Sequence, residues 1–291
     1  MPVQQPGPSR ARRVALATSR GMASLDDDGP ALRAALGRLG VDAAPVVWDD
    51  PDVDWSAYAA VVVRSTWDYV ERREEFVAWA EAVGELTTLR NPAQVLRQNT
   101  DKSYLRSLSY AGVPVVDTCW VAPGEHPDLV ALGWPELVVK PAVSGGARDT
   151  IRTADHEAAV RHLALIAASG RTAMVQPYLG TVEGVGETSV VFLAGRCSHA
   201  VRKGPMLVPE AGDPRYDITP RVPAADELAL AEAALEAVPE RADLLYARVD
   251  MVRGEDGGPV LMELELTEPA LFLSYADGAA DRLAVAISDL T

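Results

Sequence analysis

The stretch ARVDMVRGEDGGPVLMELELTEP, residues 247–269, contains two apolar runs with interspersed charges, separated by the turn GEDGG. This pattern predicts a β-hairpin whose tip lies at residues 254–258. Because residues two apart on a strand share a face, Glu263 and Glu265 point the same way and the leucines that follow them point the opposite way. Pairing of the two strands brings Asp250 alongside. The stretch therefore predicts three carboxylates on one face of a sheet.

Three like charges on one face repel one another unless a cation or a basic group balances them. Carboxylate oxygens are hard ligands that suit Mg²⁺, which commonly links one or two carboxylates to substrate phosphates. The alternative is a solvated acidic face, which is common in an acidic chain. The core-like neighbours Val249, Met251 and Leu261 favour a buried functional face.

The composition of the whole chain limits the classes of protein to consider. It has 291 residues and a net charge of −15, and 48% of its residues are hydrophobic, which is typical of a globular protein. The acidic balance argues against a nucleic acid partner. Two cysteines are too few for a disulfide framework or a cysteine zinc site, and they indicate a reducing compartment. No apolar run approaches the roughly 20 residues of a membrane-spanning helix, and the start lacks the apolar region of a signal peptide. We expect a cytoplasmic protein with a small-molecule partner and leave a homo-oligomer open.

Hydrophobic periodicity predicts an α/β protein in three parts after a loose tail at residues 1–11. Residues 12–92 alternate as strand, helix, strand, strand, helix and strand, which predicts an open α/β lobe. The pattern of apolar and polar residues changes at residue 93. We therefore expect a central part at 93–174 and a C-terminal part at 175–291. The expected later elements are helices at 99–111, 155–168, 226–238 and 277–290, and strands at 113–121, 137–140, 174–177, 188–194, 196–202, 245–252 and 259–266.

Two lysines stand where phosphate groups could bind. Lys140 ends the apolar run LVVK, and the small residues Ser144-Gly145-Gly146 follow it closely. A lysine ammonium is a compact charge that can sit between two phosphates, and glycines let a loop close over them with its backbone N–H groups. Lys102, in NTDKSYL, lies at the start of a predicted helix. Taken alone, SGG is more typical of a flexible loop, and Lys102 is more typical of a surface lysine.

The segment Gln176-Pro177-Tyr178 ends another apolar strand. A proline-fixed connector exposes backbone groups in a defined direction, which is one way to bind the edge of a purine, with the Gln176 amide assisting. The following loop EGVGE contains Glu183 and Glu187, and one of these could accept hydrogen bonds from ribose hydroxyls. A solvated loop glutamate is the alternative.

Taken in order, these residues resemble the ATP-grasp ligases over roughly residues 90–280. The resemblance rests on Lys102, on Lys140 with SGG, on Gln176-Pro177-Tyr178, on Arg248-x-Asp250 and on Glu263-x-Glu265. It implies the ATP-grasp fold, with the preceding lobe as the N-terminal α/β domain of that superfamily. It also implies ATP as the nucleotide and two Mg²⁺ ions.

The resemblance assigns roles to individual residues. The two lysines bind the phosphates of ATP, under a loop formed by Ser144, Gly145 and Gly146. Gln176, Pro177 and Tyr178 hold the adenine, and Glu183 binds the ribose. Asp250, Glu263 and Glu265 hold Mg²⁺, while Arg248 stabilises the phosphoryl and acyl-phosphate charge. The usual family pattern ends Glu-x-Asn, so Glu265 adds a negative charge in place of the asparagine.

Six further segments are similar to a small bacterial subgroup that includes the cycloserine-forming ligase: VVWDDPDVDW, VVVRSTWDYVERREEF, NTDKSYL, KPAVSGGARDT, SHAVRKGP and MELELTEPALFL. That resemblance implies ATP-dependent ring closure of O-ureido-D-serine to D-cycloserine, in antibiotic biosynthesis. A tethered nucleophile replaces a second substrate. The expected substrate-binding residues are Arg64, Ser65 and Asp68 in the first lobe, and Arg148, Arg202 and Lys203 beyond it, with Arg202 also counted as catalytic.

For each of these basic residues, a surface ion pair with an acidic neighbour is an equally good interpretation. We expect His199 to be a packed, hydrogen-bonded residue rather than a general base. We expect Trp67 and Tyr69 to be core or lobe-contact residues rather than a stacking platform.

Other functions remain open on the sequence alone. An intermolecular ligase that joins two amino acids would use the same ATP residues and differ in its acceptor pocket. A metal-dependent hydrolase could use the three carboxylates, but it would not need Lys102 or Lys140. A catalytically silent nucleotide-binding module would not need the full carboxylate set.

Overall fold

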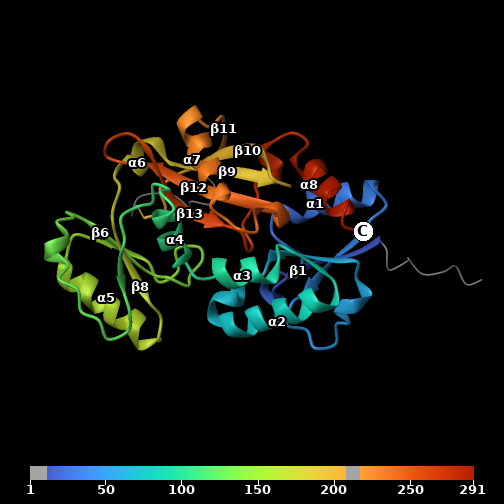
Figure 1. The fold of residues 1–291 in the computed structure, drawn as a ribbon, viewed down its shortest axis with the longest axis horizontal. Coiled ribbons are helices and arrows are strands. Elements are labelled where there is room, and N and C mark those ends of the chain that lie inside the picture. The colour runs from blue at the N-terminus through green and yellow to red at the C-terminus, as the bar shows by residue number, and fades with distance from the viewer. Residues whose placement is uncertain (1–11, 208–216) are drawn as a thin grey trace, which may run out of the picture.

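The computed structural model describes residues 12–207 and 217–291, which three β-sheets organise (Figure 1). The first sheet is parallel, in the order β2-β1-β3-β4. Its elements are β1 (Arg13–Thr18), α1 (Gly29–Arg38), β2 (Asp42–Val47), β3 (Ala60–Ser65), α2 (Arg73–Leu86) and β4 (Thr88–Arg90). β3 is buried throughout because α1 covers one face of the sheet and α2 the other. Parallel strands covered on both faces are nearly continuous apolar runs, so the predicted element order is confirmed.

The second sheet is antiparallel, in the order β5-β8-β6-β7, and α5 packs on one of its faces. This region contains α3 (Ala93–Asn99), α4 (Tyr104–Tyr110), β5 (Cys119–Val121), β6 (Leu137–Pro141), β7 (Ile151–Thr153), α5 (His156–Ala168) and β8 (Ala173–Pro177). Asp155 caps α5 by accepting a hydrogen bond from the amide of Glu157.

Two predictions in this region are wrong in detail. The helix predicted at 99–111 begins only at Tyr104, because the Asp101 carboxylate accepts the Ser103 amide in a turn between α3 and α4. The strand predicted at 113–121 is reduced to β5 and a single bridge from Val115 to Leu261.

The third sheet is antiparallel, in the order β11-β10-β9-β12-β13. Its region contains α6 (Thr181–Val185), β9 (Glu187–Leu193), β10 (Arg196–Lys203), β11 (Ile218–Arg221), α7 (Ala225–Glu236), β12 (Tyr246–Arg253), β13 (Pro259–Glu265) and α8 (Ala279–Ser288). The predicted hairpin is confirmed as β12 and β13. The short elements α3, β7, β11 and α6 were not predicted.

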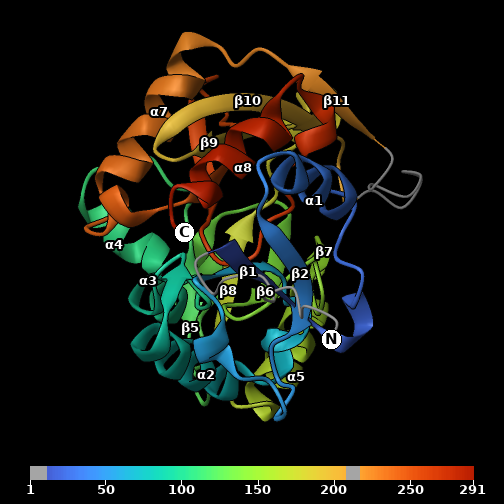
Figure 2. The same cartoon turned by 90° about the vertical axis from the view of Figure 1, so that its right-hand side faces the viewer.

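The two faces of the third sheet have different neighbours. α7 packs on one face, and part of the other face joins a core shared with α1 and α8. α1 and α8 lie side by side although they are distant in the sequence (Figures 1 and 2). Val191 and Leu193 of β9, Val201 of β10 and Tyr246 of β12 enter this shared core from the second face. The same face continues along β9 and β12 to the charged residues described next.

Candidate active site

The charged residues of the β12–β13 hairpin lie on one face, as the sequence predicts. Arg248 pairs with Glu265 and Asp250 with Glu263 in the strand register, and a bulge follows Asp250. Residues two apart on paired strands share a face, so all four side chains lie together. Asp250 and Arg248 are buried.

Asp250 is held by two basic side chains. The Arg248 guanidinium donates through Nε to Oδ1 at 2.9 Å and through Nη2 to Oδ2 at 2.8 Å. Lys203 of β10 donates from Nζ to Oδ2 at 3.0 Å. Burial disfavours the charged carboxylate, but the charges of Arg248 and Lys203 outweigh it and hold the pKa of Asp250 well below its ordinary value. This carboxylate is ionised throughout the physiological range.

Glu263 is the meeting point of the two predicted phosphate lysines. Its Oε1 lies 3.4 Å from Lys140 Nζ and 3.7 Å from Lys102 Nζ. Burial again opposes its ionisation, and the two lysines outweigh it, so the pKa of Glu263 lies below its ordinary value. Burial lowers the pKa of Lys140, against the attraction of Glu263. The structure thus brings together two lysines that are 38 positions apart in the sequence.

Two further carboxylates complete this charged face. Glu265 accepts from Arg248 Nη2 at 2.6 Å, and Glu187 pairs with Lys203. Burial raises the pKa of each to about 7, against the attraction of Arg248 for Glu265 and of Lys203 for Glu187. The sequence predicts Glu187 in a loop, but it is the buried first residue of β9. We call the eight residues the charged face: Lys102, Lys140, Glu187, Lys203, Arg248, Asp250, Glu263 and Glu265.

No three His, Cys, Asp or Glu side chains among residues 12–207 and 217–291 converge as a ready-made metal centre. The carboxylates of the charged face are each turned toward a basic partner instead. The predicted metal ligands Asp250, Glu263 and Glu265 are nevertheless on one face and offer only hard oxygen donors, which is the chemistry that Mg²⁺ prefers.

The predicted adenine-side residues gather around an arginine that was not predicted. Arg152 of β7 donates to Glu136 at 2.7 Å and to Glu183 at 2.8 Å, and its guanidinium lies over the Tyr178 ring at 3.5 Å. The Tyr178 hydroxyl donates to Glu183 at 3.0 Å. Hydrogen bonding from Arg152 lowers the pKa of Glu183.

Gln176 and Pro177 are also on this side of the site. Gln176 is buried on β8 and donates from Nε2 to the Thr118 hydroxyl at 2.9 Å. Pro177 is the last residue of β8, opposite Leu137 of β6. Gln176 and Pro177 thus end β8 next to Tyr178, which contacts Glu183.

The loop after β6 is open and tightly turned. Gly145 and Gly146 are exposed, and Gly146 has a φ of +60°, a left-handed conformation that glycine adopts without strain. Lys102 Nζ donates to the Ser144 carbonyl at 2.5 Å, which places the loop above the charged face. Arg148, a predicted substrate residue, pairs with Glu71 of the first lobe at 2.5 Å.

The remaining predicted substrate residues are scattered. Arg64 is 1% exposed and donates to the Pro269 carbonyl at 3.2 Å, while Lys203 is part of the charged face. Ser65 Oγ accepts from the Asp26 amide at 3.0 Å. Asp68 binds Trp48 Nε1 and Arg72, each at 2.9 Å. Arg202 donates to the Val185 carbonyl and to Asp217, each at 3.0 Å, and so pairs away from Arg248.

The segment that follows β13, residues 267–273, is held by its backbone. Five consecutive carbonyl groups each accept a hydrogen bond from a different side chain, at distances between 2.8 and 3.2 Å. In order from Thr267 to Leu271 the donors are Tyr246, Trp67, Arg64, Arg248 and His199. Asp28, before α1, accepts from the amides of Leu271 and Leu273, each at 2.7 Å. His199 and Trp67 are thus hydrogen-bonding and lobe-contact residues, as predicted.

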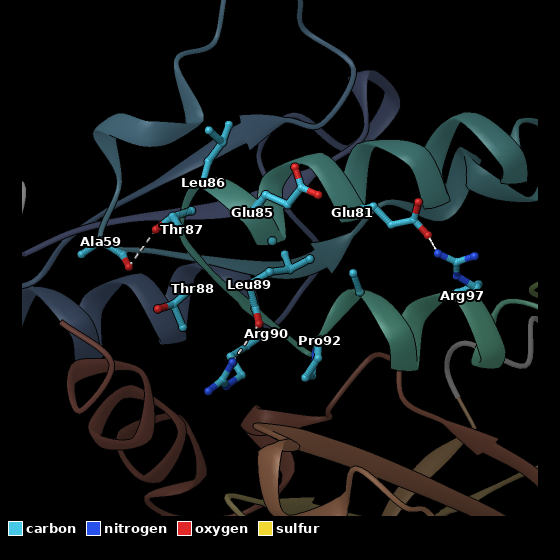
Figure 3. Close-up of a pocket in the computed structure, with 12 residues that line it drawn as sticks. Ala59, Glu81, Glu85, Leu86, Thr87, Thr88, Leu89, Arg90, Pro92 and Arg97 are labelled. Atoms are coloured by element: carbon cyan, nitrogen blue, oxygen red, sulfur yellow. Dashed lines mark hydrogen bonds and ion pairs between the residues drawn. The ribbon is translucent and has the colours of Figure 1, made fainter.

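A surface hollow lies away from all these residues (Figure 3). It is lined by the end of α2, by β4 and by the start of α3, including Glu85, Thr88 and Arg90. It contains none of the predicted site residues. No helix among the described residues is long and apolar enough to cross a membrane.

Known proteins resemble the chain over almost its whole length. Residues 14–91 match the family model described as the N-terminal domain of D-cycloserine synthetase DcsG. The chain is 38% identical over 292 residues to the cycloserine biosynthesis protein DcsG of Streptomyces lavendulae, covering 95% of this chain and 98% of that protein. A crystal structure of D-cycloserine synthetase DcsG matches with a TM-score of 0.89 and 38% identity, over 96% of this chain and 100% of that chain.

More distant structures share the fold. The D-alanine–D-alanine ligase of Bacillus anthracis, crystallised with ATP, has a TM-score of 0.70 at 18% identity, over 96% of this chain and 97% of that one. The ATP-grasp ligase PsnB, crystallised with a minimal precursor, Mg and ADP, has a TM-score of 0.65 at 17% identity, over 97% and 98%. At these identities the likeness concerns the fold alone.

Proposed function

This chain belongs to the D-cycloserine synthetase family of ATP-grasp ligases, and we propose that it closes O-ureido-D-serine to D-cycloserine at the expense of ATP. The substrate carboxylate attacks the γ-phosphorus of ATP and displaces ADP, which leaves an acyl phosphate. A nitrogen of the same molecule then attacks the acyl carbon and displaces phosphate. Water removes the carbamoyl group as carbon dioxide and ammonia, because D-cycloserine lacks it. The family and the fold predicted from the sequence are confirmed.

The observation that carries this proposal is the charged face, where four basic side chains converge on four carboxylates. Phosphoryl transfer needs positioning and neutralisation of charge rather than covalent chemistry from the protein. On this proposal Lys102 and Lys140 bind phosphate oxygens, and Arg248 neutralises the acyl phosphate. These cations now pair with carboxylates, so they are held in place before ATP arrives.

The donor set fits Mg²⁺, and we propose that Asp250, Glu263 and Glu265 hold two ions. Glu265 supplies an acid where the usual pattern has a neutral amide, and its raised pKa agrees with a carboxylate that needs a further cation nearby. When bound, Mg²⁺ would neutralise the phosphate charge during transfer. The lysines would then exchange their carboxylate partners for phosphate oxygens.

The nucleotide would extend from the charged face toward β8. The adenine would lie by Gln176 and the backbone near Tyr178, and Glu183 would accept from the ribose hydroxyls. Ser144, Gly145 and Gly146 would close over the phosphates, because the loop is exposed and its lysine contact already faces them. Closing the loop excludes water, which would otherwise hydrolyse the acyl phosphate.

Ring closure is favoured over joining two molecules because the nucleophile is tethered to the carboxylate, so no acceptor pocket is needed. Among the predicted substrate residues, Lys203 belongs to the charged face and Arg64 donates to the Pro269 carbonyl of the 267–273 segment. We propose them as the residues that bind the amino-acid part of the substrate.

The test is incubation with ATP, Mg²⁺ and O-ureido-D-serine, followed by measurement of ADP and of the isoxazolidinone ring product. We expect both to appear in equal amounts without a second amine. A strict need for added D-alanine or another amine would instead support an intermolecular ligase. Turnover without ATP would support a metal-dependent hydrolase.

A further inference from the structure

Arg152 of β7 is the centre of a network of side chains that ends at Glu183. Its Nε and Nη2 atoms donate to the two carboxylate oxygens of Glu136, at 2.7 and 2.9 Å. This bidentate contact fixes the plane of the guanidinium, because two parallel hydrogen bonds prevent its rotation. The third nitrogen, Nη1, is thereby directed at Glu183 Oε1, which lies 2.8 Å away.

Tyr178 holds the same network from a second side. The Arg152 guanidinium lies 3.5 Å from the centroid of the Tyr178 ring, and the Tyr178 hydroxyl donates to Glu183 Oε1 at 3.0 Å. The Tyr178 amide also donates to the Glu136 carbonyl at 2.9 Å, so the two residues that flank Arg152 are joined through their backbones. Glu136, Arg152 and Tyr178 therefore form one unit at the end of the second sheet where β6 begins.

Glu183 is attached to the third sheet rather than to the second. It lies on α6, where the Thr181 hydroxyl donates to the Arg253 carbonyl of β12 at 2.5 Å. Farther along α6, the Val185 carbonyl accepts from Arg202 of β10 at 3.0 Å. The ion pair at Glu183 thus joins the two sheets whose residues are proposed to bind the nucleotide.

The contacts leave one oxygen of Glu183 for a ligand. Both donors reach Oε1, and among the described residues none donates to Oε2. A carboxylate oxygen has two lone pairs, so Oε2 can accept hydroxyl groups from two adjacent carbons. The Glu183 side chain is nearly half exposed, and without such donors it would sample several rotamers, whose loss on binding costs affinity. Holding the side chain in advance removes that cost.

We propose that Arg152 is a positioning residue for ribose recognition, which holds Glu183 so that its second oxygen accepts the 2′- and 3′-hydroxyls of ATP. The inference rests on the nucleotide site of the proposed function and adds a residue to it. Arg152 acts through Glu183, because each of its three nitrogens is already bonded to a carboxylate. A single exposed ion pair contributes little, but a bidentate contact within a network fixes geometry.

Binding of ADP and of 2′,3′-dideoxy-ADP tests this role directly, because the two nucleotides differ only in the ribose hydroxyls. Neither has a γ-phosphate to transfer, so isothermal titration calorimetry of the full chain with Mg²⁺ measures binding separately from ring closure. Wild type should bind ADP roughly 10- to 100-fold more tightly than the dideoxy nucleotide, the range expected for hydrogen bonds to a charged group.

Arg152→Met keeps an unbranched side chain over Tyr178 and removes the guanidinium. It should lower the affinity for ADP about tenfold and leave the affinity for 2′,3′-dideoxy-ADP within about twofold of wild type, because only the hydroxyl contacts depend on Glu183. A purely structural role would weaken both nucleotides together. Arg161→Met, on the exposed face of α5, is the matched control and should bind both nucleotides as wild type does.

Two further variants make the result specific. Glu183→Ala should abolish the preference for ADP, and adding Arg152→Met to it should cause no further loss, because both substitutions remove the same hydrogen bonds. Glu136→Gln removes the charge that anchors Arg152 but keeps an acceptor, so it should reduce the preference for ADP less than Arg152→Met does. Circular dichroism checks the fold of each variant, and Glu136→Gln decides the question if Arg152→Met does not fold.

Three results would overturn the inference. The preference for ADP could be unchanged in the folded variants, or both nucleotides could lose affinity equally, which would assign Arg152 to the base, the phosphates or the stability of the site. If wild type does not bind ADP, the proposed function fails as well. The predicted preference for ADP without formation of cyclic product would support the inference and refute only the proposed reaction.

Discussion

Two irregular segments flank the charged face, and they are built in opposite ways. The glycine loop, residues 144–149, is exposed from Gly145 onward and turns through left-handed conformations at Gly146, Ala147 and Asp149. The 267–273 segment is mostly buried, and five of its carbonyls and two of its amides are bonded to side chains of other elements. The first segment is exposed at its two glycines and is tied to other elements at Ser144, Arg148 and Asp149. The second is held through its backbone along most of its length.

This difference indicates a division of work. An exposed glycine loop can admit ATP and then close over its phosphates, which affects nucleotide binding. A fixed segment can hold a catalytic group at a constant distance from the reacting atoms, which affects the chemical steps. Substitutions on the two sides should therefore change different kinetic constants.

The largest effect is expected for Glu263, which contacts both phosphate lysines on the charged face. Glu263→Gln removes a metal-binding charge and the partner of both lysines, so turnover should fall on the order of 10³-fold with the fold intact. ADP release and circular dichroism measure the two properties. Glu232→Gln, exposed on α7, is the control and should be fully active. Near-normal ADP release by folded Glu263→Gln would refute the metal assignment.

Lys140→Ala tests the nucleotide-binding role proposed for the glycine loop and the lysine that precedes it. Loss of a hydrogen bond to a charged group costs about 1.5–3 kcal/mol, so affinity for a non-hydrolysable ATP analogue should fall roughly 10- to 100-fold. Isothermal titration calorimetry measures that affinity, with Arg161→Ala on the exposed face of α5 as the control. An unchanged affinity would remove Lys140 from the nucleotide site.

Asp28→Asn tests the fixed segment. One of the two amides that Asp28 binds would lose its acceptor, at a cost of about 1–3 kcal/mol in the free energy of unfolding. We expect kcat to fall up to about tenfold while KM for ATP stays constant, because the segment does not bind the nucleotide. The exposed neighbour variant Asp27→Asn should show neither change. A raised KM for ATP with unchanged kcat would show that the 267–273 segment affects nucleotide binding, and would contradict the proposed division of work.

The smallest effect is expected for Gly146→Ala. A left-handed conformation costs a non-glycine residue about 1–2 kcal/mol, and no other atom lies within 4 Å of the added methyl group. The loop should therefore close less often and raise KM for ATP a few-fold, with little change in kcat. Gly37→Ala, inside α1 and equally free of contacts, should leave KM unchanged.

The sequence predicted the parts of the site that depend on local periodicity. The shared face of Glu263 and Glu265 follows from the two-residue repeat of a strand, and the tip of the hairpin follows from its turn residues. The convergence of Lys102 and Lys140 came from the family resemblance, since 38 residues separate them. The roles of these residues remain predictions.

The parts that were missed depend on contacts that no local pattern reveals. Arg152 lies on a three-residue strand too short to show alternation, and its partners are 16 and 31 positions away. Arg202 and Lys203 are adjacent in sequence, yet only Lys203 reaches the charged face because neighbouring strand residues point to opposite faces.

The central claim is that ATP activates the substrate as an acyl phosphate, and one isotope measurement tests it most directly. The substrate is labelled with ¹⁸O in both carboxylate oxygens, and the released phosphate is analysed by mass spectrometry after a single turnover. The account predicts one labelled oxygen in each phosphate, because the carboxylate oxygen that attacks ATP leaves with phosphate when the ring closes. Phosphate that carries no label from the substrate would contradict it.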